Sequence, residues 1–438
     1  MGSFVPSTPS QRQAMLEAVG VPSYEGLYES VPHSLLLKGG ELAVPDGVSE
    51  PEALLHMEEL AGKNQVFRSV FRGAGAYRHY IPAIVKRVTQ KEQFLTAYTP
   101  YQAEISQGVL QSIFEYQTMM CELTGMDVSN ASVYDGATAA AEAAAMCRER
   151  RRTVILISSA MHPQVIETVE TYAFGAGCEV RRIPQKNGRT DPDALQELLG
   201  PDTAGVLFAQ PNYYGNLEPC EELIAKAHEA GAKAVMSVNP IAMGLLKTPG
   251  ELGADIAVGE GQPLGLPMGF GGPYLGFMCA TKAMFRKLPG RIVGETVDHD
   301  GRRCYVLTLQ AREQHIRREK ASSNICSNEA LCAMTAAVYL AAQGPDGLQQ
   351  TAQLCYDKAH YLCRELEKIG LMRIHDGPFF HEFVTACPVP AETLLSALQE
   401  KGILGGLPVE GGILWCCTEL CTKGQMDEVV SVCKEVLA

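Results

Sequence analysis

The sequence has few basic side chains for its size. Its 438 residues include 37 Lys and Arg against 50 Asp and Glu, so the formal net charge is −13. Nucleic acid is therefore not an expected partner, because phosphate backbones bind to clustered positive charge. No uncharged apolar run approaches the ~18 residues that suggest a membrane span. The first six residues also lack the basic and apolar regions of a secretory signal. We therefore expect a cytoplasmic protein that does not cross a membrane.

The cysteines lack the spacing of a metal motif. The chain has 15 of them, but no two are separated by two residues, and the adjacent pair Cys416 and Cys417 is poorly placed for a metal cage. We interpret most of these thiols as small buried apolar groups in a reducing cytoplasm. No metal site is expected from this spacing.

Strand and helix patterns alternate along the chain from about residue 67. Short apolar, β-branched runs indicate strands, and segments with helical periodicity fall between them. This alternation predicts an α/β protein with a mostly parallel sheet and helices on both faces. The expected strands are residues 153–157, 180–183, 205–209 and 234–238, and the expected helices are residues 108–124, 137–150, 192–199 and 221–231.

The pattern divides into three parts. Residues 1–65 are rich in turns and read as an N-terminal arm, and residues 66–315 form the large α/β domain. Residues 316–438 read as a connecting helix followed by a small α+β domain. The expected helices outside the large domain are residues 10–19, 50–60, 328–342, 347–369 and 391–401, with short strands around Val384 and Leu414.

A glycine-rich loop that lacks a lysine follows an apolar run. It covers residues 257–273, and no lysine occurs between Lys247 and Lys282. In pyridoxal-phosphate (PLP) enzymes of the aminotransferase-like fold, such a loop carries the lysine that holds the cofactor as a Schiff base. The best-matching position here is Gln262, whose carboxamide nitrogen is not nucleophilic because its lone pair is delocalised into the carbonyl. The loop therefore cannot bind PLP covalently.

Two further positions agree with a degenerate cofactor site. Asp135 precedes the alanine-rich helix, where an ordinary capping role is the favoured interpretation. A carboxylate there would occupy the N–H groups that would otherwise bind a phosphate, and it would repel the dianion. The strand at residues 234–238 ends at Asn239, which is a weaker partner for a pyridinium proton than Asp because it carries no charge. Either change alone could be misalignment, but together they make a consistent case.

Two polar segments have alternative interpretations. Residues 98–108 gather Tyr98, Tyr101, Gln102 and Glu104 just before a helix, either as a capping segment or as a ligand contact. Residues 310–324 form either a solvated basic face or an anion site that reaches a neighbouring subunit's cofactor. The glycine loop at residues 72–80 lies against a ligand or a partner's backbone. His162 is taken as structural, and the roles of His162 and His79 stay open.

Several motifs occur together in a specific order. They are Tyr-Thr-Pro-Tyr-Gln at residues 98–102 with Glu104, the alanine run at 139–145 after Asp135 and Gly136, Pro-Met-Gly-Phe-Gly-Gly-Pro at 267–273, Pro-Gly-Arg-Ile-Val-Gly-Glu-Thr at 289–296, and Arg-Arg-Glu-Lys at 317–320 with Ser323 and Asn324. Over essentially the whole chain, this set resembles the N-terminal half of the P-protein of the glycine cleavage system. Many bacteria make that half as a separate subunit.

The resemblance implies a type I PLP fold and a heterotetramer with two copies each of subunit 1 and subunit 2. Subunit 2 would supply PLP and its lysine at the interface, where glycine is decarboxylated and its aminomethyl group passes to the lipoyl arm of H-protein. Tyr98, Tyr101, Gln102 and Glu104 would contribute to that site. Ser323 and Asn324 would position phosphate or substrate from across the interface.

Two other functions remain open at this point. An independent PLP enzyme, such as a decarboxylase or desulfurase, would need a lysine in the loop that carries Gln262. A scaffold or regulatory subunit would take no part in catalysis.

Overall fold

The computed structural model describes residues 6–36, 44–45, 47–95, 100–321, 323–325 and 327–438. Contacts divide the chain into two units, Met1–Gln65 and Val66–Ala438. The finer division of the second unit at residues 315 and 316 stays a prediction. Among the described residues, no helix combines the length and apolar character needed to cross a bilayer.

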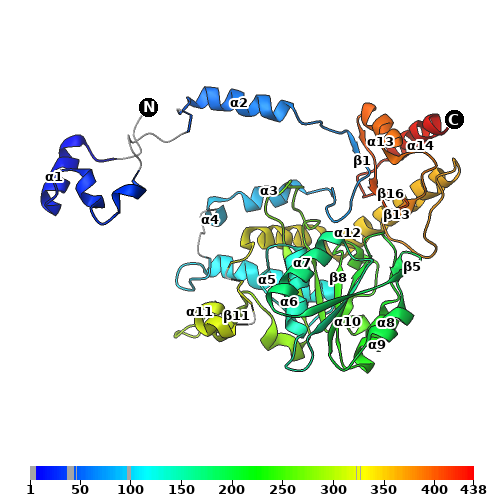
Figure 1. Cartoon of the computed structure of the whole chain (residues 1–438), viewed down its shortest axis with the longest axis horizontal. Helices are drawn as coiled ribbons and strands as arrows, with labels where there is room; N and C mark the ends of the chain where they lie inside the picture. The colour runs from blue at the N-terminus through cyan, green and yellow to red at the C-terminus, as the bar shows by residue number, and fades with distance from the viewer. Residues whose placement is uncertain (1–5, 37–43, 46, 96–99, 322, 326) are drawn as a thin grey trace. The chain divides into compact units, whose positions relative to one another are not determined.

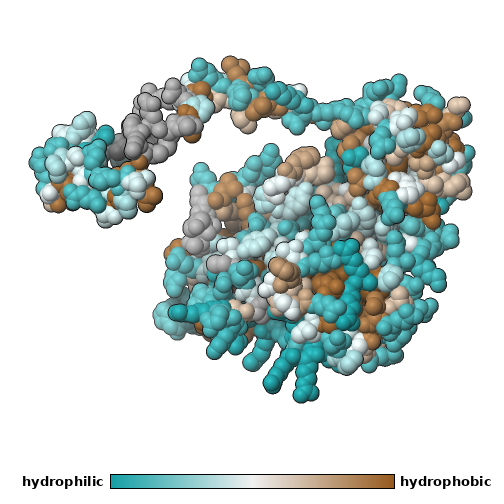
Figure 2. Space-filling view, in the orientation of Figure 1, coloured by the Kyte–Doolittle hydropathy of each residue, from teal (hydrophilic) through white to brown (hydrophobic). Residues whose placement is uncertain are grey.

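The first unit consists of short helices with strong N-terminal caps. Helices α1 (Pro9–Val19) and α2 (Glu50–Gly62) each begin with a capping box, in which Thr8 and Ser49 accept hydrogen bonds from the backbone three residues later. Between them lie 3₁₀ turns at Tyr24–Tyr28 and His33–Leu35. The predicted helices 10–19 and 50–60 are confirmed. None of the residues of α2 is buried, and Figure 2 shows apolar atoms along its surface.

A seven-stranded sheet forms the centre of the second unit, with the strand order β2-β10-β9-β8-β7-β3-β4. Neighbouring strands from β9 to β4 are parallel, whereas β10 runs antiparallel to both β9 and β2. The predicted α/β class with a mostly parallel sheet is confirmed (Figure 1). The strands are β2 (Val128–Ser129), β3 (Val154–Ser158), β4 (Glu179–Ile183), β7 (Thr203–Gln210), β8 (Lys233–Val238), β9 (Ile256–Glu260) and β10 (Gly276–Ala280).

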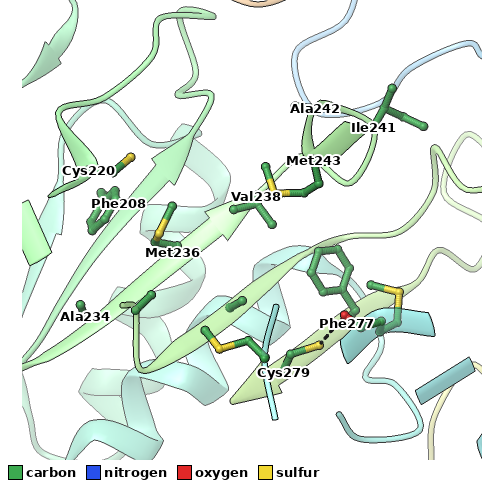
Figure 3. Packing of buried hydrophobic residues seen from close by; sticks show 14 of the residues in the cluster. Phe208, Cys220, Ala234, Met236, Val238, Ile241, Ala242, Met243, Phe277 and Cys279 are labelled. Atoms are coloured by element: carbon green, nitrogen blue, oxygen red, sulfur yellow. Dashed lines mark hydrogen bonds between the residues drawn. The ribbon is translucent and has the colours of Figure 1, made fainter. Parts of the chain in front are cut away.

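Alternate residues of these strands enter two different hydrophobic clusters. On one face, Phe208, Met236 and Phe277 pack in a cluster that also takes side chains from helices α5, α9 and α12 (Figure 3). On the other face, Leu207 and Val235 pack against α6 and α7. This period of two is what a strand buried on both faces requires. The helices are α5 (Gln107–Thr124), α6 (Gly136–Cys147), α7 (Pro163–Gly175), α8 (Pro192–Leu198), α9 (Cys220–Glu229), α10 (Pro249–Leu252) and α12 (Ala330–Glu367).

Several elements escaped the sequence analysis. Neither helix α7 nor the strands β9 and β10 were assigned from the sequence. Other short pieces were also missed, because strands of about five residues or fewer and helices of one or two turns show little periodicity. The missed pieces include the helices α3 (Ala83–Thr89), α4 (Glu92–Leu95) and α11 (Gln314–Arg317), the hairpins β5 (Gln185–Lys186) with β6 (Arg189–Thr190) and β11 (Val293–Val297) with β12 (Arg303–Leu307), and the 3₁₀ turns Ala242–Gly244, Lys282–Lys287, Gln310–Arg312 and Arg318–Lys320.

Helix α12 leads into the small C-terminal part. The two helices predicted at residues 328–342 and 347–369 are joined, with a kink at Gly344, whose φ of 63° is left-handed, followed by Pro345. Beyond it, a three-stranded antiparallel sheet in the order β13-β16-β15 packs with two helices around buried Trp415 and Phe383. These elements are β13 (Glu382–Thr385), α13 (Ala391–Glu400), β15 (Leu407–Val409), β16 (Gly412–Cys416) and α14 (Lys423–Leu437), and β1 (Ser69–Val70) pairs with β14 (Ile403–Leu404).

Candidate functional site

A cavity of about 380 Å³ lies where the carboxyl ends of β7, β8 and β9 meet the start of α6. This edge of a parallel sheet is where α/β folds bind ligands. The lining includes backbone of residues 74–77 and polar side chains from both halves of the chain, namely Tyr77, Asp135, His162, Tyr213, Asn239, Glu260, Tyr274 and Glu382. Two of the three residues predicted for a degenerate cofactor site, Asp135 and Asn239, line this cavity, and the third, Gln262, is adjacent to its wall.

Two carboxylates occupy the N-terminus of α6. Asp135 is the N-cap residue, and its Oδ1 accepts a hydrogen bond from Thr138 N at 2.7 Å. Glu260 Oε2 accepts from Gly136 N at 3.0 Å. The predicted capping role of Asp135 is thereby confirmed. Glu260 was missed because a single acidic residue at the end of an apolar strand gave no motif.

Glu260 also holds the glycine-rich loop. Its Oε1 accepts from Gln262 N at 2.9 Å and from Leu275 N at 3.0 Å. Burial raises the pKa of this carboxyl, although three backbone N–H groups favour its charged form. A Cβ at residue 136 would lie 2.9 Å from the Glu260 backbone, which explains why glycine stands there.

Gln262 is buried, and its side chain is fully engaged. Its Oε1 accepts from Tyr77 N at 2.9 Å, while its Nε2 donates to Tyr77 O at 3.0 Å and to Leu266 O at 2.8 Å. The carboxamide therefore ties the loop at residues 74–77 to the loop that follows β9. Its role in this chain is structural.

The side chain of Asn239 is fixed by the backbone just after it. Its Oδ1 accepts from Ile241 N at 2.9 Å, which fixes the side chain at the end of β8, while its buried Nδ2 has no hydrogen-bond partner among the described residues. An amide in this place supplies no negative charge for a pyridinium nitrogen.

The residues present do not fit PLP. Residue 262 cannot form a covalent bond to the cofactor, and a phosphate at the start of α6 would meet the carboxylates of Asp135 and Glu260. Two of the N–H groups at this helix N-terminus, those of Gly136 and Thr138, already donate to these carboxylates. The cavity has the position of a cofactor pocket without its chemistry.

Glu382 and His162 form the wall opposite α6, and sequence reasoning did not connect them. Glu382 accepts from Ala74 N and from the Tyr77 hydroxyl, both at 2.7 Å, and burial raises its pKa to about 7. His162 caps α7 by accepting from Gln164 N at Nδ1, so its Nε2 donates to Ala74 O at 3.1 Å. Burial lowers the pKa of His162, which keeps it neutral in the structural role predicted for it.

The segment before α5 lies apart from this cavity. Tyr98 falls outside the described residues. The Tyr101 ring lies under the Arg291 guanidinium, 5.2 Å from it, and packs next to the β11–β12 hairpin. Gln102 and Glu104 are exposed, and Gln102 O accepts from Ser106 N at 3.0 Å. Gln102 and Glu104 therefore face solvent, and none of the three described residues lines the cavity at the start of α6.

Ser323 and Asn324 line a second cavity of about 290 Å³ between α6, α7 and the residues around α11. Buried Glu142 faces the same space. Its pKa is raised to about 7 by burial, an effect that the Ser323 hydroxyl reduces. The predicted residues are thus found in three places and not in a single site.

Comparison with known proteins places the chain in one family. The family described as "Glycine cleavage system P-protein" matches residues 2–433. A "Probable glycine dehydrogenase (decarboxylating) subunit 1" of Moorella thermoacetica is 49% identical over the full length of both chains. A crystal structure of glycine decarboxylase (P-protein) in inhibitor-bound form superposes with a TM-score of 0.93 at 42% identity, covering 99% of this chain and 100% of that one.

More distant structures agree on the fold. The alanine–glyoxylate aminotransferase of Nostoc sp. covers 85% of this chain and 96% of its own with a TM-score of 0.59 at 17% identity, which confirms the predicted aminotransferase-like architecture. The words "subunit 1" in the names of the relatives imply a second subunit in those enzymes. The full-length match, the superposition and the cavity geometry agree, and the chain belongs to the P-protein family of the glycine cleavage system.

Proposed function

We propose that this chain is the lysine-less subunit of a glycine dehydrogenase (decarboxylating) and that it completes the active site of a second subunit. The observation that carries the proposal is that polar groups at this chain's own cavity are already hydrogen-bonded within the chain. Gln262, which the sequence matches to the lysine, donates and accepts three internal hydrogen bonds, and two carboxylates occupy the helix N-terminus where a phosphate would bind. One distant structural neighbour is described with glycine covalently linked to its PLP cofactor, and this chain would need another chain to hold such a group.

The second subunit would bind PLP, which supplies the electron sink for decarboxylation of glycine. The aminomethyl group would pass to the lipoyl arm of H-protein, which makes H-protein a further partner. Two copies of each subunit would form an α2β2 heterotetramer in the cytoplasm. The contribution of this chain would be a wall of the partner's site.

The outward-facing segment before α5 is the candidate wall. Tyr98, Tyr101, Gln102 and Glu104 would line the partner's pocket, and Arg291 would hold the Tyr101 ring in place. Ser323 and Asn324 would reach phosphate or substrate from across the interface. Exposure of Gln102 and Glu104 in the isolated chain supports this proposal.

Glycine–bicarbonate exchange and the visible absorption of bound PLP test the division of labour. Both are measured for this chain alone, for subunit 2 alone and for the mixture, with PLP and H-protein present. We expect neither signal from this chain alone, and activity of the mixture above that of subunit 2. A borohydride-fixed cofactor on this chain alone would instead identify an independent PLP enzyme. Full activity of subunit 2 by itself would identify a scaffold.

Tyr98→Phe and Tyr101→Phe test the proposed wall. Phenylalanine removes only the hydroxyl, and at residue 101 it keeps the ring under Arg291. We expect kcat of the reconstituted complex to fall by about 10-fold or more, as when a positioned hydrogen-bond donor is lost. Tyr356→Phe, on α12, serves as the matched control. Unchanged kinetics in both test variants would contradict the assignment.

A further inference from the structure

Three side chains that commonly bind metals come together from distant parts of the sequence. They are His79 after β1, Cys355 on α12 and Glu419 after β16, and their ligand atoms all lie within 4.8 Å of one another. Only 2% of the His79 side chain and 10% of the Glu419 side chain are exposed, and Cys355 is buried. None of the three belongs to the cavity at the start of α6.

Surrounding groups orient Glu419. Its Oε1 accepts a hydrogen bond from Tyr80 N, and the Lys358 ammonium donates to its backbone carbonyl. Its Oε2 lies 2.7 Å from His79 Nδ1 and 3.5 Å from Cys355 Sγ. One oxygen is therefore fixed by the backbone, while the other lies where a nitrogen and a sulfur converge. Such outer contacts are typical of metal sites, where they fix the direction of the ligand atoms.

The same region holds buried nitrogen atoms without partners. His79 Nε2 and both ring nitrogens of His381 have no hydrogen-bond partner among the described residues. The His381 ring lies 4.7 Å from the Tyr77 ring, and the His79 ring lies 6.4 Å from it on the same loop. Buried polar atoms in native proteins are nearly always satisfied, so these nitrogens indicate water or an ion in the region. They are not the ligand atoms of the three-residue cluster, because His79 faces Glu419 Oε2 through Nδ1.

We propose that His79, Cys355 and Glu419 bind one Zn²⁺ ion, with a fourth position open to water. A nitrogen, a sulfur and an oxygen donor form a set that suits Zn²⁺ among the common divalent cations. On binding, the Cys355 S–H bond breaks, the proton leaves to solvent and the sulfur electron pair binds the metal. The thiolate and the carboxylate then balance the charge of the ion.

The ion would tie three segments together. It would join the loop at residues 72–80, which forms part of the cavity wall through Ala74 and Tyr77, to α12 and to the small C-terminal part. Its effect would be on stability and not on the reaction. The expectation of no metal rested on cysteine spacing alone, and residues 79, 355 and 419 have no such spacing to detect.

Metal content of the purified full chain is the first measurement. After dialysis against metal-free buffer, the protein is titrated with Zn²⁺ and, separately, with Co²⁺, whose thiolate charge-transfer absorption reports a bound cysteine. We expect one equivalent of either ion, displacement of Co²⁺ by Zn²⁺, and a higher thermal unfolding midpoint with metal. Absence of a stoichiometric equivalent would overturn the proposal without need of any variant.

Variants then locate the ion. Cys355→Ala and Glu419→Gln should each weaken Co²⁺ binding by about 100-fold and abolish the thermal shift. Cys433→Ala, which removes another buried thiol from the small-domain core, should leave both unchanged. Tight binding retained by Cys355→Ala, or lost equally in Cys433→Ala, would show that the metal binds elsewhere and overturn the site.

Discussion

Two buried polar clusters in this chain differ in whether their hydrogen-bonding groups have partners. Around Gln262 and Glu260, side-chain oxygens and the carboxamide nitrogen find backbone partners at 2.8–3.0 Å. Around His79 and His381, three ring nitrogens have no partner among the described residues. The first cluster borders the cavity at the carboxyl ends of the sheet strands, whereas His79 and His381 do not line that cavity.

The contrast teaches how a lost site differs from one that is incomplete. When a ligand is given up for good, its polar contacts must be replaced within the chain, because an unsatisfied buried group is costly. Under the proposed function, Gln262 and Glu260 would be such replacements. Buried groups without partners, such as the His381 ring nitrogens, either bind something from outside the chain or carry the cost of burial, and a substitution distinguishes the two. The predictions below test this contrast from both sides.

Replacing Gln262 by Leu should have the largest effect on stability. The change leaves Tyr77 N, Tyr77 O and Leu266 O buried without partners, and each orphaned group costs about 1–3 kcal/mol. We expect a loss of about 4 kcal/mol in the free energy of unfolding, measured from the urea midpoint. Exposed Gln353→Leu on α12 is the control and should stay within about 0.5 kcal/mol. A loss below 1 kcal/mol for Gln262→Leu would mean that the satisfied cluster contributes little.

Glu382 should make the protein less stable as the pH rises. Burial raises its native pKa to about 7, although the hydrogen bonds from Ala74 N and the Tyr77 hydroxyl act to lower it, against about 4.3 for an unfolded Glu. The native state therefore binds more protons than the unfolded state between these values, and stability falls with pH. Between pH 5 and pH 8 this group should remove about 2.5 kcal/mol.

Glu382→Gln isolates that effect, because the amide imitates the protonated carboxyl. Urea unfolding at pH 5 and pH 8 should show a smaller loss of stability in the variant than in the parent chain. Glu142→Gln is the matched comparison, since Glu142 also has a pKa near 7 from burial, but at the other cavity. An unchanged pH dependence in Glu382→Gln would show that its hydrogen bonds outweigh burial.

The secondary-structure elements around the site could be predicted from the sequence, but the hydrogen bonds between them could not. The strands at residues 205–209 and 234–238 and the capping role of Asp135 follow from local patterns, and the structure confirms them. The match of Gln262 to a cofactor lysine stays a prediction. The bond between Gln262 and Tyr77 spans 185 residues of sequence, and no periodicity encodes it. Glu260 was missed for a related reason, because its three N–H partners come from loops whose approach depends on the fold.

His381→Phe should have the smallest effect, and it tests the contrast from the unsatisfied side. Neither ring nitrogen has a partner, so the change loses no hydrogen bond, and a phenyl ring can occupy the same space between Tyr77 and Phe380. We expect a change of less than about 1 kcal/mol in the free energy of unfolding. His360→Phe is the control, because His360 Nε2 donates to Phe379 O at 3.1 Å and this bond is worth about 1 kcal/mol. If His381→Phe lowers the free energy of unfolding as much as Gln262→Leu does, a bound water or ion satisfies His381. The polar groups of both clusters would then have partners.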